Sequence, residues 1–170
     1  KYAPAEGGVM LQTEDEISAC TMAIGAAHAG ARAFTATAGP GLSLMAEAIG
    51  LAEMTETPLV VIDTQRGGPS TGLPTKHEQS DLMAAIYNTH GDTAKIVISP
   101  SSIEESFYDT FEAFNLAEEY QCPVIVLSDL QLSLGKQSVT SLDYGKLQVR
   151  RGKLVKDGLP EIKSPEYFKR

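Results

Sequence analysis

Residues 58–63 read Pro-Leu-Val-Val-Ile-Asp, a proline followed by four consecutive apolar side chains and a carboxylate. An uninterrupted run of apolar and β-branched residues is typical of a strand buried on both faces of a parallel sheet. Residues 95–99 (Lys-Ile-Val-Ile-Ser) and 123–128 (Pro-Val-Ile-Val-Leu-Ser) repeat the type. These three segments predict the central strands of one sheet.

Segments with helical spacing lie between these strands. Residues 15–29 and 42–54 carry apolar side chains every three to four positions, and Gly30 offers a stop after the first. A third helix begins after Ser101 or Ser102, each a candidate N-cap with two glutamates in the first turn. Its expected buried stripe comprises Ile103, Phe107, Phe111 and Phe114.

Shorter strands are expected at residues 9–12 and 33–37. The alternation predicts an α/β fold, a mostly parallel sheet with helices on both faces, whose ligands bind beyond the carboxyl ends of the strands. Residues 1–132 are expected to form this domain. Residues 133–170 turn charged and weakly periodic, which predicts a linker toward a further domain or an arm around a partner.

The net charge of the 170 residues is −8, which disfavours a nucleic-acid partner because phosphate neutralisation requires clustered cations. The densest basic stretch is interpreted as a solvated linker face; it comprises Arg150, Arg151, Lys153 and Lys156. No apolar run approaches the ~20 residues that span a bilayer, and no signal peptide is visible. The expected location is the cytoplasm, with no membrane contact.

Cys20 and Cys122 lie far apart in apolar surroundings and form no C-x-x-C motif. They are interpreted as small buried hydrophobes in a reducing compartment. The chain alone is therefore expected to build no zinc site and no iron–sulfur cluster. Of its three histidines, only His77, in a long loop, is a candidate for a functional role.

The long loop from Asp63 to Lys76 is rich in glycine and proline and follows a predicted buried strand. Loops of this length in compact domains are usually functional. Arg66 lies just past the strand end, where a guanidinium can bind a carboxylate through two parallel hydrogen bonds. A structural surface ion pair is the alternative for Arg66.

Two shorter segments are further candidates. Residues 37–41 (Thr-Ala-Gly-Pro-Gly) lead into a helix and expose backbone N–H groups suited to an anion, although such a turn can be only a turn. Thr13 and Glu16 fit a capping box, in which Glu16 bonds back to the Thr13 backbone. The alternative is a carboxylate that faces a neighbouring subunit.

Taken together, these stretches resemble the alpha subunit of 2-oxoglutarate and related 2-oxoacid:ferredoxin oxidoreductases. The resemblance covers residues 8–132, and its most specific part is 65–76 (Gln-Arg-Gly-Gly-Pro-Ser-Thr-Gly-Leu-Pro-Thr-Lys). The other matching stretches are 14–19, 22–27, 35–45, 54–60, 113–118 and 123–129.

The resemblance implies a pyrimidine-binding domain of the thiamine-diphosphate fold, with the cofactor at a subunit interface. The family's catalytic glutamate, which hydrogen-bonds the pyrimidine ring nitrogen and favours the imino tautomer, matches Glu16, with Glu14 as the fallback. The arginine that binds the 2-oxoacid carboxylate matches Arg66. Positions expected to flank cofactor or substrate are Thr37, Gly39, Gly41, Ser70 and Thr71.

The implied reaction is oxidative decarboxylation of a 2-oxoacid, with 2-oxoglutarate favoured, to an acyl-coenzyme A, with electrons passed to ferredoxin. In the family, the diphosphate site with Mg²⁺ and the iron–sulfur clusters lie on other subunits or domains. A beta subunit, a hetero-oligomer and an inactive isolated chain are therefore expected. The family's first strand is expected before Lys1.

Two other functions remain open at this point. The domain could be a non-catalytic scaffold that keeps the fold, or part of a carboligase-type thiamine enzyme. Loss of turnover in an assembled Glu16→Gln complex would indicate a catalytic domain rather than a scaffold. Electron transfer to a low-potential acceptor, rather than carbon–carbon bond formation, would indicate an oxidoreductase rather than a carboligase.

Overall fold

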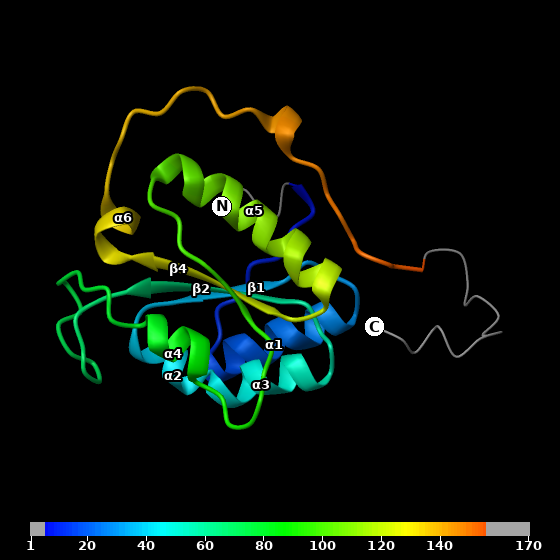
Figure 1. Cartoon of the computed structure of the whole chain (residues 1–170), viewed down its shortest axis with the longest axis horizontal. Helices are drawn as coiled ribbons and strands as arrows, with labels where there is room; N and C mark the ends of the chain where they lie inside the picture. Colours follow the sequence, from blue (N-terminus) through cyan, green and yellow to red (C-terminus); the bar gives the residue numbers. More distant parts are fainter. Residues whose placement is uncertain (1–5, 156–170) are drawn as a thin grey trace.

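The computed structural model describes residues 6–155. Its sheet consists of β1 (Phe34–Thr37), β2 (Leu59–Gln65), β3 (Ile96–Ile98) and β4 (Pro123–Asp129). The order is β1-β2-β4-β3, and every pair is parallel. Helices cover both faces of this sheet (Figure 1), so the predicted α/β class is confirmed.

The apolar run at residues 59–63 forms most of β2, an inner strand of the sheet. All seven residues of β2 pair with β4, and Leu59, Val60 and Val61 are at most 1% exposed. Because side chains alternate along a strand, Leu59 and Val61 join one apolar cluster while Val60 joins the other. Asp63, near the carboxyl end of the same strand, is also fully buried.

Four helices lie on one face: α1 (Glu16–His28), α2 (Pro40–Leu44), α3 (Ala46–Met54) and α4 (Leu82–Tyr87). The long helix α5 (Ile103–Tyr120) covers the other face, where Ala113 and Ala117 pack against β2 and β4. Small side chains let the helix axis approach the sheet closely. After β4 the chain forms α6 (Leu130–Leu134) and a short 3₁₀ helix (Tyr144–Lys146).

Three sequence-based expectations about elements are wrong: a strand at 9–12, an unbroken helix over 42–54 and the buried stripe of α5. Residues 9–12 form no strand because no described strand pairs with them, and Val9 and Met10 are 80% and 74% exposed. The helix expected over 42–54 is interrupted at Met45, although the apolar spacing continues through the break.

The expected stripe on α5 is only half-buried at all four positions. The fully buried positions of this helix are Ala113, Asn115, Ala117 and Glu118. The aromatic side chains instead lie along the flank of the helix, where Phe107 meets Tyr144 at a ring separation of 5.8 Å and Phe114 meets Phe34 at 5.9 Å.

From residue 135 the chain runs along the outer side of α5 (Figure 1). We call residues 136–155 the arm. The arm is attached early by the Tyr108 hydroxyl, which accepts a hydrogen bond from the Asp143 N–H at 2.8 Å. It is attached again by Asn115, whose amide bonds the Gln148 carbonyl and the Arg150 N–H at 3.0 Å each.

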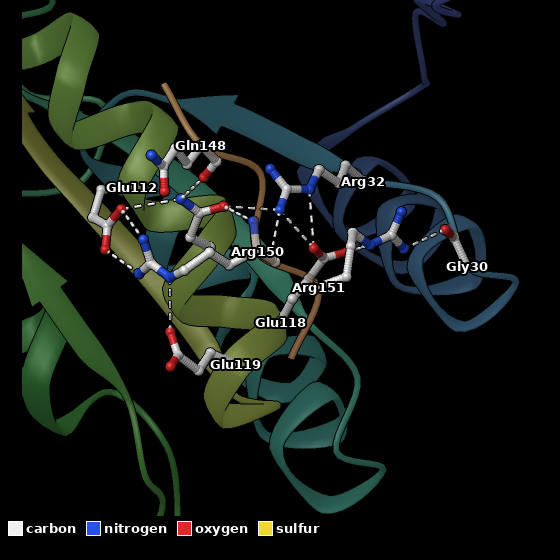
Figure 2. A network of polar contacts seen from close by, with 9 residues as sticks. Gly30, Arg32, Glu112, Glu118, Glu119, Gln148, Arg150 and Arg151 are labelled. Atoms are coloured by element: carbon white, nitrogen blue, oxygen red, sulfur yellow. Dashed lines mark hydrogen bonds and ion pairs between the residues drawn. The ribbon is translucent and has the colours of Figure 1, made fainter. Parts of the chain in front are cut away.

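The basic stretch of the arm is partly engaged in ion pairs (Figure 2). Arg150 pairs with Glu112 and Glu119, while Arg151 pairs with Glu118 at 2.6 Å. Arg150 is paired but remains exposed, in agreement with a solvated face, whereas Arg151 is half-buried and contradicts it. The interpretation also agrees with the exposure of Lys153, and Lys156 lies outside the described residues.

Both cysteines are buried and unbridged, and burial raises the pKa of the Cys20 thiol to about 11. None of the helices within residues 6–155 has the length and apolar character needed to cross a bilayer.

Candidate functional site

The candidate site lies where β1 and β2 end, at the carboxyl edge of the sheet. Thr37 closes β1 and leads into the Ala38–Gly41 turn, and Gln65 closes β2 and leads into Arg66 and the long loop. The N-terminus of α1 reaches the same edge, since Glu16 contacts this turn. Three segments far apart in the sequence therefore supply the site.

Helix α1 begins at Glu16, directly after its N-cap residue Asp15. Asp15 has the extended backbone of an N-cap residue, and its carboxylate accepts a hydrogen bond from the Ser18 N–H at 2.8 Å. Thr13 is only a donor to the Asp15 carbonyl, at 3.0 Å. The capping box predicted for Thr13 and Glu16 is therefore wrong, because Asp15 already occupies the N-cap position.

The Glu16 side chain lies against Gly41 rather than bonding back to the start of its own helix. A Cβ added at Gly41 would lie 2.9 Å from Glu16 Cγ and 3.0 Å from Oε1, and it would overlap Thr37 Oγ1. Glu16 is half-buried, and its carboxylate has no hydrogen bond or ion pair with any described residue. Glu14, the fallback, is exposed. Glu16, Thr37 and Gly41 thus form one contact group.

Arg66 lies across the same turn from the other side. Gly39 adopts φ +56° and ψ −105°, a left-handed conformation that favours glycine. A Cβ there would lie 3.2 Å from Arg66 Cγ and 3.5 Å from Nε. The Arg66 Nε–H is buried and has no acceptor among the described residues. Glycine at this position therefore leaves room for the arginine side chain.

A carboxyl group that the sequence-based analysis counted only as the end of a strand lies beneath this turn. Asp63 Oδ1 accepts a hydrogen bond from the Gly39 N–H at 3.0 Å. Burial, followed by the charge of Asp81, raises the pKa of Asp63 to about 7. One signal was available in the sequence, because Asp63 is the only ionisable residue in the apolar run 59–63.

The loop after Arg66 folds back on itself. Gly67 forms an isolated antiparallel bridge with Leu73, and its N–H bonds the Lys76 carbonyl at 2.8 Å. Ser70 and Thr71 lie on the exposed part of this loop. The structure records no contact between these two residues and Glu16 or Arg66. His77 is also exposed.

Five predicted positions therefore come together, and two do not. The group comprises Glu16, Thr37, Gly39, Gly41 and Arg66. It presents a carboxylate without a partner, a guanidinium N–H without an acceptor and a glycine-lined surface between them. A guanidinium N–H without an acceptor is suited to a carboxylate. Residues 6–155 contain no group of three or more His, Cys, Asp or Glu that could hold a metal.

The sequence matches the model of a protein family described as pyruvate flavodoxin/ferredoxin oxidoreductase, thiamine-diphosphate-binding, over residues 1–165. It is 49% identical to the 2-oxoglutarate synthase subunit KorA of Methanothermobacter thermautotrophicus, over 94% of this chain and 45% of that protein. It is 51% identical to 2-oxoacid:ferredoxin oxidoreductase 1, subunit alpha, of Aeropyrum pernix, over 86% of this chain and 23% of that protein.

A solved structure of 2-oxoglutarate:ferredoxin oxidoreductase from Magnetococcus marinus, with 2-oxoglutarate, coenzyme A and succinyl-CoA bound, has the same fold. It superposes with a TM-score of 0.76 at 54% identity and covers 77% of this chain and 23% of that chain. The present chain spans less than half the length of each of these proteins.

Proposed function

The chain belongs to the thiamine-diphosphate-binding domain family of pyruvate flavodoxin/ferredoxin oxidoreductases, and we propose that it supplies the pyrimidine-binding half of the cofactor site. The complete protein would oxidatively decarboxylate a 2-oxoacid to an acyl-coenzyme A and pass the electrons to ferredoxin. The named relatives support an oxidoreductase rather than a carboligase. 2-Oxoglutarate is favoured because it is named for one relative and bound in the solved structure.

The remaining parts of the machinery are proposed to lie outside this chain. A beta subunit would carry the diphosphate site with Mg²⁺, and the iron–sulfur clusters would lie on other subunits or domains of a cytoplasmic hetero-oligomer. The isolated chain would then be inactive. Residues 133–170 are proposed to be a linker, with the arm as part of it, that leads from this domain toward the rest of the longer protein.

Thiamine diphosphate supplies the electron sink for decarboxylation when it is bound. In this chain, Glu16 is proposed to hydrogen-bond a pyrimidine ring nitrogen and to hold a proton at that atom. Its carboxylate is suited to the role because it is half-buried and makes no hydrogen bond with residues 6–155. Thr37 and Gly41 restrict the space around it.

Arg66 is proposed to bind the carboxylate of the 2-oxoacid. Its buried Nε–H has no acceptor in the described part of the chain, and an arginine binds a carboxylate through two parallel hydrogen bonds. Gly39 lies directly beneath the Arg66 side chain. Ser70 and Thr71, on the exposed loop, are proposed to flank cofactor or substrate less directly.

The single observation that carries the proposal is the orientation of Glu16. A scaffold domain has no need for a carboxylate that lies against Gly41 without a hydrogen-bonding partner among residues 6–155. Burying part of an ionised group without a partner costs free energy, so a ligand that supplies the missing hydrogen bond accounts for its position.

The decisive experiment compares Glu16→Gln with wild type in the complete, cofactor-loaded complex. Glutamine keeps the size but cannot exchange a proton, so kcat is expected to fall about 10²–10⁴-fold while the subunits remain assembled. Glu47→Gln, an exposed carboxylate in the first turn of α3, is the matched control and should leave turnover unchanged. Assembly is followed by size-exclusion chromatography.

Unchanged turnover of an assembled Glu16→Gln complex would refute the catalytic role and support a scaffold. If Glu14→Gln lowers turnover instead, the catalytic carboxylate is the neighbouring one. Formation of a carbon–carbon bond in place of acceptor reduction by the wild-type complex would contradict the oxidoreductase assignment.

A further inference from the structure

Two carboxyl groups meet behind the candidate site, and the role proposed above for the cofactor does not use them. Asp63 is fully buried near the carboxyl end of β2. Asp81 is half-buried and lies five residues after the end of the long loop, directly before α4. Its N–H bonds the Gln65 side-chain oxygen at 2.9 Å, which returns the chain to the end of β2.

Each of these carboxyl groups has an oxygen that lacks a donor. Asp63 Oδ2 and Asp81 Oδ2 are both buried, and neither receives a hydrogen bond from an N–H or O–H group of residues 6–155. Unsatisfied buried oxygens are uncommon in folded proteins and call for a specific explanation. The two side chains nevertheless lie within hydrogen-bonding reach of each other.

A shared proton accounts for all of these observations. Two ionised carboxylates in contact repel each other and have no hydrogen to share, whereas one carboxylic acid can donate to one carboxylate. The environment favours the protonated form: burial and then the charge of Asp81 raise the pKa of Asp63 to about 7. Burial and then the charge of Glu78 raise the pKa of Asp81.

We propose that Asp63 and Asp81 hold one proton between them, and that this acid pair is a positioning element that fixes the Gly39 turn beneath Arg66. Oδ1 of Asp63 holds the Gly39 N–H, so the pair controls the backbone on which the Arg66 side chain rests. Gly41, at the other end of the same turn, contacts Glu16.

The effect of the acid pair on binding of the 2-oxoacid rests on the function proposed above, whereas the shared proton does not. One further charged group acts on the pair directly, since the charge of Glu78 raises the pKa of Asp81. Arg66 and Glu16 contact the turn that Asp63 holds, at Gly39 and Gly41 respectively. The strand neighbours of Asp63 in the sheet are Thr37 and Leu127, neither of which carries a charge.

The sign of the pH dependence follows from the raised pKa of Asp63. The folded protein binds this proton more tightly than the unfolded chain, so its stabilising contribution is complete below about pH 4. The contribution is lost as the pH rises through about 7, where the folded group ionises. Asp63→Asn should abolish this alkaline loss, since an amide is a permanent substitute for the neutral acid.

The test uses the complete complex with Asp63→Asn, Asp63→Ala and Asp81→Asn. Each asparagine still offers one acceptor and one donor, so both variants should keep the KM for the 2-oxoacid within about twofold of wild type. Asp63→Ala removes the acceptor of the Gly39 N–H and should raise this KM about tenfold, with a smaller change in kcat. Asp92→Asn, an exposed carboxyl, is the control.

A second readout detects the proton without measuring activity. In aspartate-labelled protein at pH 6, the infrared difference between wild type and Asp63→Asn should contain the C=O stretch of a protonated carboxyl group. The difference between wild type and Asp92→Asn should not contain it. Absence of the band from wild type overturns the shared proton, even if Asp63→Ala fails to fold.

A band accompanied by an unchanged KM in Asp63→Ala overturns the positioning role. A band in a complex whose turnover does not depend on Glu16 supports the acid pair and refutes only the catalytic proposal. The two proposals can therefore fail separately.

Discussion

At the scale of single residues, Arg66 is the most constrained side chain of the site. Its stem crosses Gly39, and its Nε–H is buried without an acceptor among residues 6–155. A buried donor left without a partner costs about 1–3 kcal/mol, which an incoming carboxylate can recover. The substrate-binding role proposed for Arg66 therefore uses a donor that no described residue occupies.

Arg66→Lys tests this reading in the complete complex. Lysine keeps the charge but loses the planar pair of donors, so the KM for the 2-oxoacid should rise about 10–100-fold, with a smaller effect on kcat. Steady-state kinetics over a range of 2-oxoacid concentrations measures both constants. Lys76→Gln removes a cation from the same loop and serves as the control. An equal rise in both variants would indicate only a general effect of local charge.

The sequence revealed some of these residues and concealed others for a physical reason. Glu16 and Arg66 follow from spacing relative to a helix end and a strand end, together with the family resemblance. The burial of Asp63 could not be predicted, because a carboxylate at the end of a strand is expected to be solvated unless a turn and a loop cover it. Its contact with Asp81 depends on where the long loop returns, which no local pattern encodes. The same loop carries Ser70 and Thr71 away from the grouped residues.

At the scale of elements, both helix starts were predicted, but the N-cap residue was predicted for α5 and missed for α1. Ser102 caps α5 as expected, accepting from the Glu105 N–H at 3.1 Å, while the Glu105 carboxylate returns to the Ser101 N–H. For α1, both Thr13 and Asp15 are good caps, and only the backbone geometry selects Asp15. The strand expected over 9–12 lacks a described neighbour to pair with, which a propensity cannot reveal.

Ser102→Ala should loosen the first turn of α5. Loss of a serine cap costs about 1 kcal/mol, which corresponds to about a fivefold increase in local opening. Hydrogen exchange measured by mass spectrometry on the full chain should show faster exchange for peptides that cover 101–110. Ser141→Ala, an exposed serine in the arm, is the control. Equal exchange in the two variants would mean that the cap contributes little to α5.

At the scale of the whole molecule, one cluster of charges joins three distant segments. Glu118 of α5 pairs with Arg32, which precedes β1, at 2.7 Å and with Arg151 of the arm at 2.6 Å (Figure 2). Arg32 also donates to the Arg150 carbonyl, and Arg151 donates to the Gly30 carbonyl, both at 2.7 Å. Glu118 is almost fully buried, so its charge depends on the two more exposed arginines for neutralisation.

Glu118→Gln should release the arm and destabilise the domain. Removing one member of a buried ion pair costs about 3–5 kcal/mol, and the partial exposure of both arginines reduces the expected loss to about 2–3 kcal/mol. Glu119→Gln is the matched control, since this exposed neighbour pairs with Arg150 alone among residues 6–155 and its loss should cost about 0–1 kcal/mol. Thermal unfolding and limited proteolysis within residues 136–155 of the full chain measure both effects. Equal behaviour of the two variants would contradict this prediction.

The arm runs from one end of the domain to the other. The chain leaves the sheet after β4 at the edge where Glu16 and Arg66 gather, and it travels along α5 to Gly30 and Arg32, beside the opposite ends of the strands (Figure 1). The exposed Lys153 follows Arg151 in the arm and therefore offers an attachment point remote from the candidate site. A fluorescent label placed there would report detachment of the arm without touching Glu16 or Arg66.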